Sequence, residues 1–426
     1  MKYFWFCLLF VSAQLSAQSE LTIEVTRGMD QPTSIAVVPF VWSSPGTAPQ
    51  SLDQIVRDDL RRSGFFDTMS PNNMLSFPAP GPNINFRDWR ITDTEYLLLG
   101  SVELNAAGYQ VLFELYDVIS ERLVLSRTVT GGPTNARDVA HRISDIVYED
   151  LTGIRGVFST RILYVTDNRQ GNEVSQYQLM LADQDGAREE VILTSQSELM
   201  SPAWSPDGTE VAYVSWETGR QAIFRQNLET GEREQLTNFP NINGSPTWSP
   251  DGTKMAMVLS KDGNPEIYIL DLQTREFTRI TEHYEIDTEP AWTADGRSLV
   301  FTSTRGGKPQ IYRVDIDSRR VVRLTFRGDY NARPRLSIDG RFLVMVHQSE
   351  GVFHIAVQDL TDSTFLIVTE TELDESPTIA PNGAMVMYAT KWQNRSILAA
   401  VSLDAGIKYR LPAQTADVRE PAWSPF

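Results

Sequence analysis

Ser245-Pro-Thr-Trp-Ser-Pro-Asp-Gly252 is the stretch of sequence that decides the fold, because versions of it recur at regular intervals. The other versions begin at Ser201, Glu289, Arg333, Ser376 and Glu420. Each carries a proline as its second residue, at positions 202, 246, 290, 334, 377 and 421, so the intervals are 44, 44, 44, 43 and 44 residues. A period this regular indicates a repeat architecture in which each period is one structural unit.

Each period predicts four short strands. The first strand carries the Pro-x-Trp unit, and the Pro-Asp-Gly or Asn-Gly that follows it predicts a turn, since glycine accepts a positive φ and Asp or Asn caps the turn. The second and third strands are apolar runs such as Val211–Ser215 and Ile267–Leu270, and the fourth ends at pairs such as Leu324-Thr325. Four strands in a period of this length are typical of a β-propeller blade.

The number of blades follows from the two ends of the repeat region. Counting 44 residues back from Pro202 reaches position 158, where there is no Pro-x-Trp, although apolar runs for the second, third and fourth strands follow. The C-terminus supplies an isolated first strand at Pro421–Ser424. Residues 156–426 therefore predict an all-β six-bladed β-propeller closed by the C-terminal strand, which leaves no exposed sheet edge at the joint.

A bulky apolar residue occupies the second position after each proline: Trp204, Trp248, Trp292, Leu336, Ile379 and Trp423. Because leucine and isoleucine serve at two of these positions, the site requires bulk rather than an indole, which favours packing between blades over ligand stacking. The Asp-Gly pairs lie in separate blades and lack the clustered oxygens of a calcium loop, so we interpret them as turns.

Residues 18–155 lack the repeat and predict a separate α/β domain. The apolar runs Leu21–Val25 and Ile35–Phe40 predict strands, and a meander of three strands is expected between residues 96 and 129. The alternation of strands and helices in this region is what an α/β domain requires.

Two helices are expected in this domain. The first begins at Ser51, with Gln54 as its capping-box partner, and ends at Gly64. The second runs from about Asn135 to Leu151, with its apolar residues on one face.

The N-terminus has the pattern of a secretory signal peptide, residues 1–17. Lys2 precedes the apolar run Tyr3–Val11, and small residues follow. We expect cleavage after Ala17, with Ala13 as the alternative, and no transmembrane segment in the mature chain because no later apolar run is long enough. Cys7, the single cysteine among 426 residues, would be removed with the signal peptide.

The charge balance bears on the class of partner. Lysine and arginine number 38 against 55 aspartates and glutamates, which gives a formal net charge of −17. An acidic surface repels phosphate backbones, so we expect no nucleic-acid binding.

Catalytic motifs are missing from the sequence. It contains no nucleophile elbow, zinc-binding His-Glu-x-x-His, phosphate loop or dinucleotide fingerprint. His347 and His354 could meet across a hairpin but lack further ligands, and Glu103, Glu114 and Asp117 on the meander suit a solvated sheet face better than a glycosidase pair. We therefore expect no catalytic residue, no metal and no cofactor.

The combination of motifs resembles one family. A secreted chain with Ile35-Ala-Val-Val-Pro-Phe40, Leu151-Thr-Gly-Ile154 and repeats closing on Pro421-Ala-Trp-Ser-Pro425 is similar along its whole length to the TolB family, the periplasmic component of the Tol-Pal system of Gram-negative bacteria. The resemblance implies a non-enzymatic, monomeric scaffold. Its propeller would bind Pal, an outer-membrane lipoprotein, and its N-terminal end would bind TolA, which reaches out from the inner membrane. The system supports outer-membrane invagination and integrity during cell division.

The loops that lead into the innermost strands meet at the rim of the channel because the ring is closed, and the resemblance implies that this face receives Pal. The expected Pal contacts are Asn241, Ile242, Asn243, Gly244, Ser245, Asp287, Thr288, Glu289, Asn331, Arg333, Asp374, Glu375 and Glu420. The expected TolA contacts are Gln18, Ser19, Glu20, Leu21, Thr22, Ile23 and Glu24. Charge reversal at Asp287 or Glu289 is expected to weaken Pal binding without unfolding the protein, and Thr288→Trp is expected to weaken it more.

An enzyme that uses the channel mouth, such as a lyase or a glycosidase, is the alternative function. It would require Asp287, Glu289, Asp374, Glu375 and Glu420 to converge with a metal or a base. The same acids also suit solvated turns or a rim complementary to a basic partner.

Overall fold

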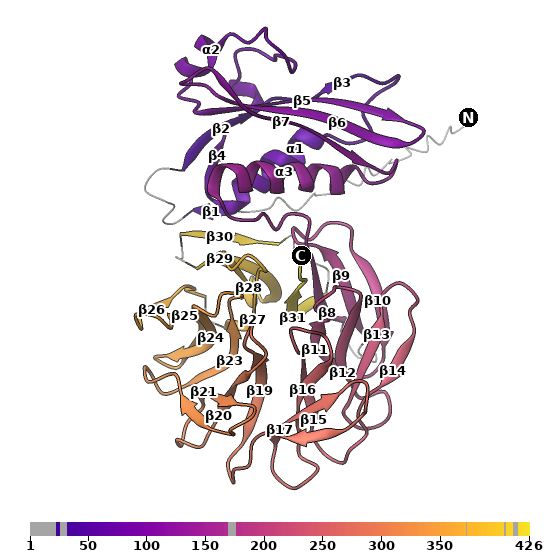
Figure 1. Ribbon diagram of the computed structural model, residues 1–426, viewed down its shortest axis with the longest axis vertical. Coiled ribbons are helices and arrows are strands. Elements are labelled where there is room, and N and C mark those ends of the chain that lie inside the picture. The colour runs from indigo at the N-terminus through magenta and orange to yellow at the C-terminus, as the bar shows by residue number, and fades with distance from the viewer. Residues whose placement is uncertain (1–22, 26–31, 169–175, 372, 404–405, 412–415) are drawn as a thin grey trace, which may run out of the picture.

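The computed structural model describes residues 23–25, 32–168, 176–371, 373–403, 406–411 and 416–426. Six blades form a ring, and a smaller α/β domain lies beside the blades at the two ends of the repeat region (Figure 1). The predicted fold class is confirmed. The expected signal peptide lies outside the described residues, and the domain boundary at residue 155 stays a prediction.

The N-terminal domain is built on one mixed sheet. Its parallel part places β2 (Thr33–Val37) between β4 (Phe66–Thr68) and β5 (Tyr96–Asn105), with β3 (Val41–Trp42) also parallel to β5. The expected meander follows as the antiparallel strands β5, β6 (Gly108–Asp117) and β7 (Arg122–Gly131).

Helices cover both faces of this sheet. The helices α1 (Leu52–Ser63) and α3 (Ala136–Thr152) lie between the sheet and the propeller (Figure 1). Their apolar residues share one core with the sheet. The short helices η1 (Pro71–Asn73) and α2 (Phe86–Ile91) belong to the other side, where Trp89 is buried in a second core.

The start of α1 differs from the expected capping box. Ser51 precedes the helix, but its hydroxyl donates to Asp53 at 2.9 Å, and the Gln54 amide donates to Asp58 at 2.9 Å. The expected end is confirmed: Gly64 has a φ of 73°. A Cβ on Gly64 would also lie 1.3 Å from Cδ1 of Ile407, so glycine allows the propeller to approach the helix end closely.

The blades are antiparallel sheets, numbered here in chain order from the closing blade. Blade 1 contains β31 (Asp417–Trp423), β8 (Arg161–Asn168), β9 (Gln176–Asp183) and β10 (Glu190–Ser195). Blade 2 contains β11 (Leu199–Trp204), β12 (Glu210–Ser215), β13 (Ala222–Asn227) and β14 (Arg233–Gln235). Blade 3 contains β15 (Asn243–Trp248), β16 (Lys254–Leu259), β17 (Glu266–Asp271) and β18 (Phe277–Arg279).

The second half of the ring repeats this order. Blade 4 contains β19 (Asp287–Trp292), β20 (Ser298–Ser303), β21 (Gln310–Asp315) and β22 (Val321–Arg323). Blade 5 contains β23 (Asn331–Leu336), β24 (Phe342–Ser349), β25 (Val352–Asp359) and β26 (Phe365–Ile367). Blade 6 contains β27 (Glu375–Ile379), β28 (Met385–Trp392), β29 (Arg395–Ser402) and β30 (Ile407–Arg410).

The C-terminal strand closes the ring, as predicted. Strand β31 pairs antiparallel with β8, with Trp423 opposite Ile162. The Trp423 indole N–H also donates to the Thr160 hydroxyl at 2.7 Å. The innermost strand of blade 1 therefore comes from the end of the chain, while its other three strands come from the beginning of the repeat region.

The tryptophans at the repeated position lie between blades, as expected. The Trp204 indole of blade 2 donates to the Ala422 carbonyl of blade 1 at 3.0 Å, and the Trp292 indole of blade 4 donates to the Thr247 carbonyl of blade 3 at 3.1 Å. Each indole thus joins two neighbouring innermost strands.

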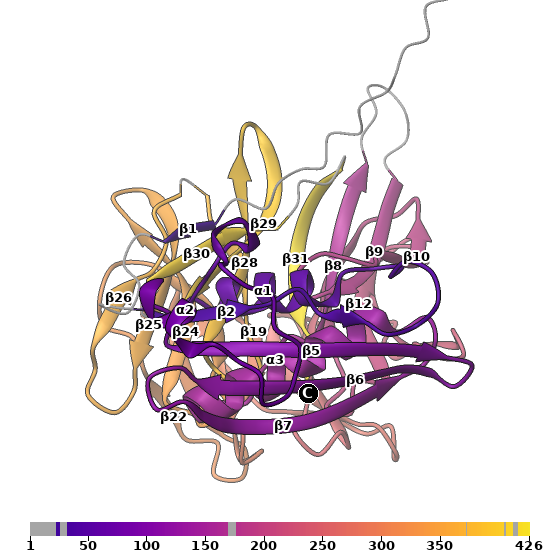
Figure 2. The ribbon, with the colours of Figure 1, turned by 90° about the horizontal axis from the view of Figure 1, so that it is seen from above.

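Strand β1 (Ile23–Val25) differs from expectation in its partner. It pairs antiparallel with β30 and becomes the fifth strand of blade 6, with Ile23 opposite Tyr409 (Figure 2). The apolar run Leu21–Val25 predicts a strand of the N-terminal domain. Its backbone pairs instead with the free edge of β30, because an outer blade strand offers unpaired N–H and C=O groups.

Candidate functional site

Each innermost strand bends at the residue before its repeat proline. These six residues have φ between 49° and 55°, and the strand register shifts at each of them: Ser201, Ser245, Glu289, Arg333, Ser376 and Glu420. A non-glycine residue with a positive φ is unusual, and its recurrence shows that a β-bulge is built into every blade. We call these six residues the bulge ring.

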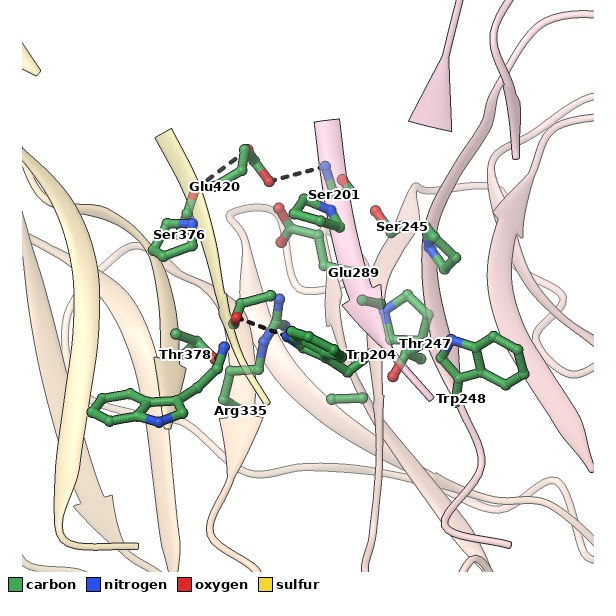
Figure 3. Close-up of a pocket in the computed structure, with 18 of the residues that line it drawn as sticks. Ser201, Trp204, Ser245, Thr247, Trp248, Glu289, Arg335, Ser376, Thr378 and Glu420 are labelled. Carbon is green, nitrogen blue, oxygen red and sulfur yellow. Dashed lines mark hydrogen bonds between the residues drawn. The ribbon is translucent and has the colours of Figure 1, made fainter. Parts of the chain in front are cut away.

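The bulge ring lines a cavity of about 280 Å³ in the central channel (Figure 3). Thr247, Thr378, Arg335 and the tryptophans 204, 248 and 423 line the same cavity. The site is therefore a polar, partly open space at the axis of the ring.

Arg333 ties the bulge ring together across four blades. Its guanidinium Nε lies 3.1 Å from Glu289 of blade 4, and its Nη1 lies 2.9 Å from Glu420 of blade 1. It also donates to the Ser376 hydroxyl of blade 6. The Glu420 carboxylate chiefly accounts for the raised pKa of Arg333. Burial is the largest single effect on Glu420 and would raise its pKa, but Arg333, Arg335 and the Ser201 N–H together lower it.

Four of the expected Pal contacts lie in the interior instead of at the rim. Asn243, Asp287, Asn331 and Asp374 are 0% exposed. They share the position three residues before the repeat proline, which the structure places at or just before the start of the innermost strand. This corrects the expectation that these residues form rim loops.

The side chains of these four residues hold neighbouring segments in place. Asn243 donates to the Phe239 carbonyl at 2.8 Å, and Asp287 accepts from Arg305 at 2.6 Å. Because these polar groups are buried and paired, replacing them would disturb the fold before it affected a partner.

The remaining expected contacts divide into two groups. Ser245, Glu289, Arg333 and Glu420 belong to the bulge ring inside the channel, and Gly244 is buried beside it. Asn241, Ile242 and Glu375 are exposed, and Thr288 is partly exposed. These four lie on the face of the ring at which the innermost strands begin, which we call the leading face; the opposite face, at which they end, is the trailing face.

The leading face also carries apolar residues that the sequence analysis missed. Tyr284 is 81% exposed, Phe326 is 75% exposed and Ile286 is 45% exposed. They lie in the loops before β19 and β23. The sequence offers one signal for these residues, which is the presence of apolar side chains within otherwise polar loops.

The candidate catalytic acids do not assemble a catalytic pair. Glu289 and Glu420 are both paired with Arg333. Glu114 accepts from the Tyr116 hydroxyl at 2.6 Å, and its strand partner is Leu99, four residues along β5 from Glu103. At about 3.3 Å per strand residue this offset separates the Glu103 and Glu114 positions too widely for joint action on one bond.

His347 and His354 do face each other across the β24–β25 hairpin, as expected from their spacing. His347 hydrogen-bonds Asn331 at 2.9 Å, and His354 lies 3.9 Å from the Asp374 carboxylate. The two rings are therefore engaged with different partners.

A second cluster of charged side chains joins the two domains. Asp183, at the end of β9, and Asp185, in the turn that follows, lie toward α1 and α3. Arg62 lies 3.2 Å and Arg137 lies 2.5 Å from the Asp185 carboxylate. His141 of α3 lies 2.7 Å from Asp59 of α1 and 3.7 Å from Asp183. We call these six residues the interdomain cluster.

The interdomain cluster has the residue types of a metal site, since Asp59, His141 and Asp185 could each turn one ligand atom toward a common point. Arginines already occupy the carboxylates, however. Burial alone would lower the pKa of His141, but Asp59 and the hydrogen bond to Asp183 outweigh it and raise that pKa to about 9. The carboxylates are thus shared between arginines and an imidazole whose charged form they favour, which is the arrangement of an ion-pair network.

Comparisons with known proteins agree for both domains. The sequence model described as the TolB amino-terminal domain matches residues 21–124, and the one described as the TolB beta propeller domain matches residues 148–426. None of the helices in the described part of the chain is long and apolar enough to cross a membrane.

Individual relatives match nearly the whole chain. The Tol-Pal system protein TolB of Pseudomonas fluorescens (strain SBW25) is 55% identical over 416 residues, which cover 97% of this chain and 96% of that protein. TolB of Pseudomonas syringae pv. syringae is 55% identical over 421 residues, 98% of this chain and 97% of that protein. The crystal structure of TolB from Acinetobacter baumannii is 42% identical, with a TM-score of 0.88, and the match covers 96% of this chain and all of that one. The chain belongs to the TolB family of Tol-Pal system proteins.

Proposed function

We propose that the chain is a non-enzymatic periplasmic scaffold of the Tol-Pal system, which binds Pal through the propeller and TolA through its N-terminal end. The observation that carries the proposal is the match of both domains, in order, to Tol-Pal system proteins over nearly the whole chain. In this role it supports outer-membrane invagination and integrity during cell division.

The leading face suits a protein partner. Tyr284, Ile286 and Phe326 expose apolar surface there, and Ile242 does so in the loop before β15. Exposed aromatic and aliphatic side chains with a polar surround are the usual anchors of protein interfaces. Side chains of the N-terminal domain contact trailing-face turns of the propeller, such as those of Asn382 and Asp185, and β1 pairs with the edge of β30. These contacts of the described residues leave the loops of the leading face available to Pal.

The N-terminal segment suits recognition as an extended peptide. Only three residues of it, Ile23–Val25, pair with β30 in the described part of the chain. A strand this short is weakly held at a sheet edge, and an extended segment can add to a partner sheet through its main chain. We assign TolA binding to residues 18–24, of which 18–22 lie outside the described residues.

The channel carboxylates support a scaffold over an enzyme. A general acid or base needs a side chain free to exchange a proton with substrate. Glu289 and Glu420 instead share the fixed charge of Arg333, and each also accepts from a backbone N–H of another blade.

Matched isoleucines at the two ends of the blades test the Pal surface. Ile286→Asp on the leading face should weaken Pal binding in titration calorimetry about tenfold or more, as expected when an interface anchor is lost. Ile338→Asp changes the same residue type in the exposed turn between β23 and β24 on the trailing face and should bind Pal normally. Equal binding by both variants, each folded by circular dichroism, would move the Pal site off the leading face.

Deletion of residues 18–24 tests the TolA site. The truncated chain should lose TolA binding and retain Pal binding, because the two sites are on different parts of the molecule. Normal TolA binding by the truncated chain would place the TolA site elsewhere.

Mass spectrometry of the periplasmic protein should give Gln18 as the first residue.

A further inference from the structure

Arg335 places a positive charge in the channel without an ionic partner. It lies on β23, two residues after Arg333, and lines the channel cavity. Its recorded hydrogen bond runs from Nη1 to the Pro334 carbonyl at 2.9 Å, and none of the described carboxylates lies within 4.0 Å of it. A guanidinium has five N–H donors, so most of its donors are available to the cavity.

The two acids that line the cavity make their direct ion pairs with Arg333 and act on Arg335 only from a distance. Glu289 and Glu420 form their ion pairs with Arg333. Burial, the largest effect, and the like charge of Arg333 lower the pKa of Arg335, and the opposite effects of Glu289 and Glu420 do not cancel them. A partly buried cation that lacks a direct ion pair is stabilised by a nearby anion.

The bulge ring shows how the channel holds carboxylates. The backbone N–H of Arg333 donates to Glu289 of the preceding blade at 2.9 Å, and that of Ser201 donates to Glu420 of the preceding blade at 3.3 Å. The same bulge with a φ of 49° occurs at Ser245, where the preceding blade offers Ser201 in place of a carboxylate. The backbone geometry that binds a carboxylate at Arg333 and Ser201 is therefore repeated at Ser245, where the preceding blade supplies no carboxylate.

We propose that the channel cavity binds a small oxyanion, a carboxylate or a phosphate, with Arg335 as its charged partner and the bulge amide of Ser245 and the hydroxyls of Thr247 and Thr378 as neutral donors around it. Guanidinium groups pair with carboxylate and phosphate through two parallel hydrogen bonds, which suits both members of this class. The cavity of about 280 Å³ far exceeds the ~10–15 Å³ that one water needs, so it can hold such an anion with part of its hydration.

Titration calorimetry of the full mature chain with sodium acetate and with inorganic phosphate tests the proposal, against sodium chloride at equal ionic strength. At least one of the two probes should show saturable binding that chloride does not reproduce. Acetate binding alone identifies the ligand as a carboxylate, phosphate binding alone identifies it as a phosphate, and either supports the site. No saturable binding by either probe would overturn it.

Variants locate the binding. Arg335→Gln should weaken the affinity for the probe about tenfold or more, since it removes a charge-assisted pair, and Arg335→Lys should have a smaller effect because it keeps the charge. Arg297→Gln, which changes an exposed arginine in the turn before β20, should leave binding unchanged. Undiminished binding by Arg335→Gln would contradict the proposal.

A crystal of the unmodified protein soaked in selenate keeps the test valid if Arg335→Gln does not fold. The anomalous signal of selenium should appear beside Arg335. Its absence from the channel, when calorimetry shows oxyanion binding, would place the anion elsewhere and overturn the assignment.

Discussion

Residues at one repeat position behave alike in burial although they differ in chemistry. The position three residues before each repeat proline holds Leu199, Asn243, Asp287, Asn331, Asp374 and Val418, and all six are buried. The polar members resemble rim residues in the sequence, because Asn and Asp are typical of loops. Only the structure shows that their side chains satisfy buried partners, as Asn243 does for the Phe239 carbonyl.

Charge reversal at Asp287 should therefore unfold the protein rather than act only on Pal. Asp287→Lys places a second positive charge beside Arg305, the partner that lies 2.6 Å from the native carboxylate. Breaking a buried ion pair costs about 3–5 kcal/mol, so the melting temperature should fall clearly in calorimetry.

Glu375→Lys is the matched control, because Glu375 is exposed one residue after a buried aspartate of the same repeat position. Its melting temperature should stay close to that of the unmodified protein. Equal stability of the two variants would show that Asp287 is not a structural anchor.

At the scale of elements, α1, α3 and the turn after β9 meet in the interdomain cluster. The helix spans and their C-terminal glycines were predictable from apolar periodicity and from glycine's tolerance of a positive φ. The cluster was not, because Asp59, His141 and Asp185 are far apart in the sequence and each is an ordinary polar residue by itself. The pairing of β1 could not be predicted for the same reason. Its apolar run predicts a strand, but its partner β30 is far away in the sequence and is determined by tertiary structure.

The stability of the protein should fall as pH rises through the titration of His141. The pKa of His141 is raised from 6.5 to about 9 in the folded protein, so the imidazolium stabilises the native state fully below pH 6.5 and loses this contribution by about pH 9. A shift of this size corresponds to about 3 kcal/mol. Urea unfolding at intervals across pH 6.5–9 should show the decline in the free energy of unfolding.

His141→Gln should flatten this pH dependence, whereas His283→Gln, in a blade loop, should retain it. The opposite side of the cluster behaves inversely: Arg62 and Arg137 outweigh burial and lower the pKa of Asp185, so its contribution is lost as the pH falls below the ordinary carboxyl range. If the free energy of unfolding of His141→Gln falls between pH 6.5 and 9 as steeply as that of the unmodified protein, His141 is not the source of the pH dependence.

At the scale of the whole molecule, the ring depends on one strand from the far end of the chain. The proline spacing predicted six blades and the closing strand, because a first strand was missing near residue 158 and a spare one was present at 421–424. What could not be predicted was the interior of the ring, since the bulge at each pre-proline residue and the reach of Arg333 across blades arise only when six strands converge.

Deletion of residues 420–426 should open the ring. The deletion removes the Trp423 side chain from its buried site together with the Ala422–Leu163 and Trp423–Ile162 pairs of β31 and β8, and losses of this kind cost several kcal/mol. A melting temperature equal to that of the full chain would contradict closure by β31.

Hydrogen–deuterium exchange of the full mature chain, with and without purified Pal, tests most directly the claim that the leading face is the Pal-binding surface. The account predicts slower amide exchange on Pal binding in loops 238–242, 282–286 and 326–330, with the trailing-face turn at 338–340 unchanged. Protection confined to the trailing face or to the sheet of the N-terminal domain, with these three loops exchanging as before, would contradict it.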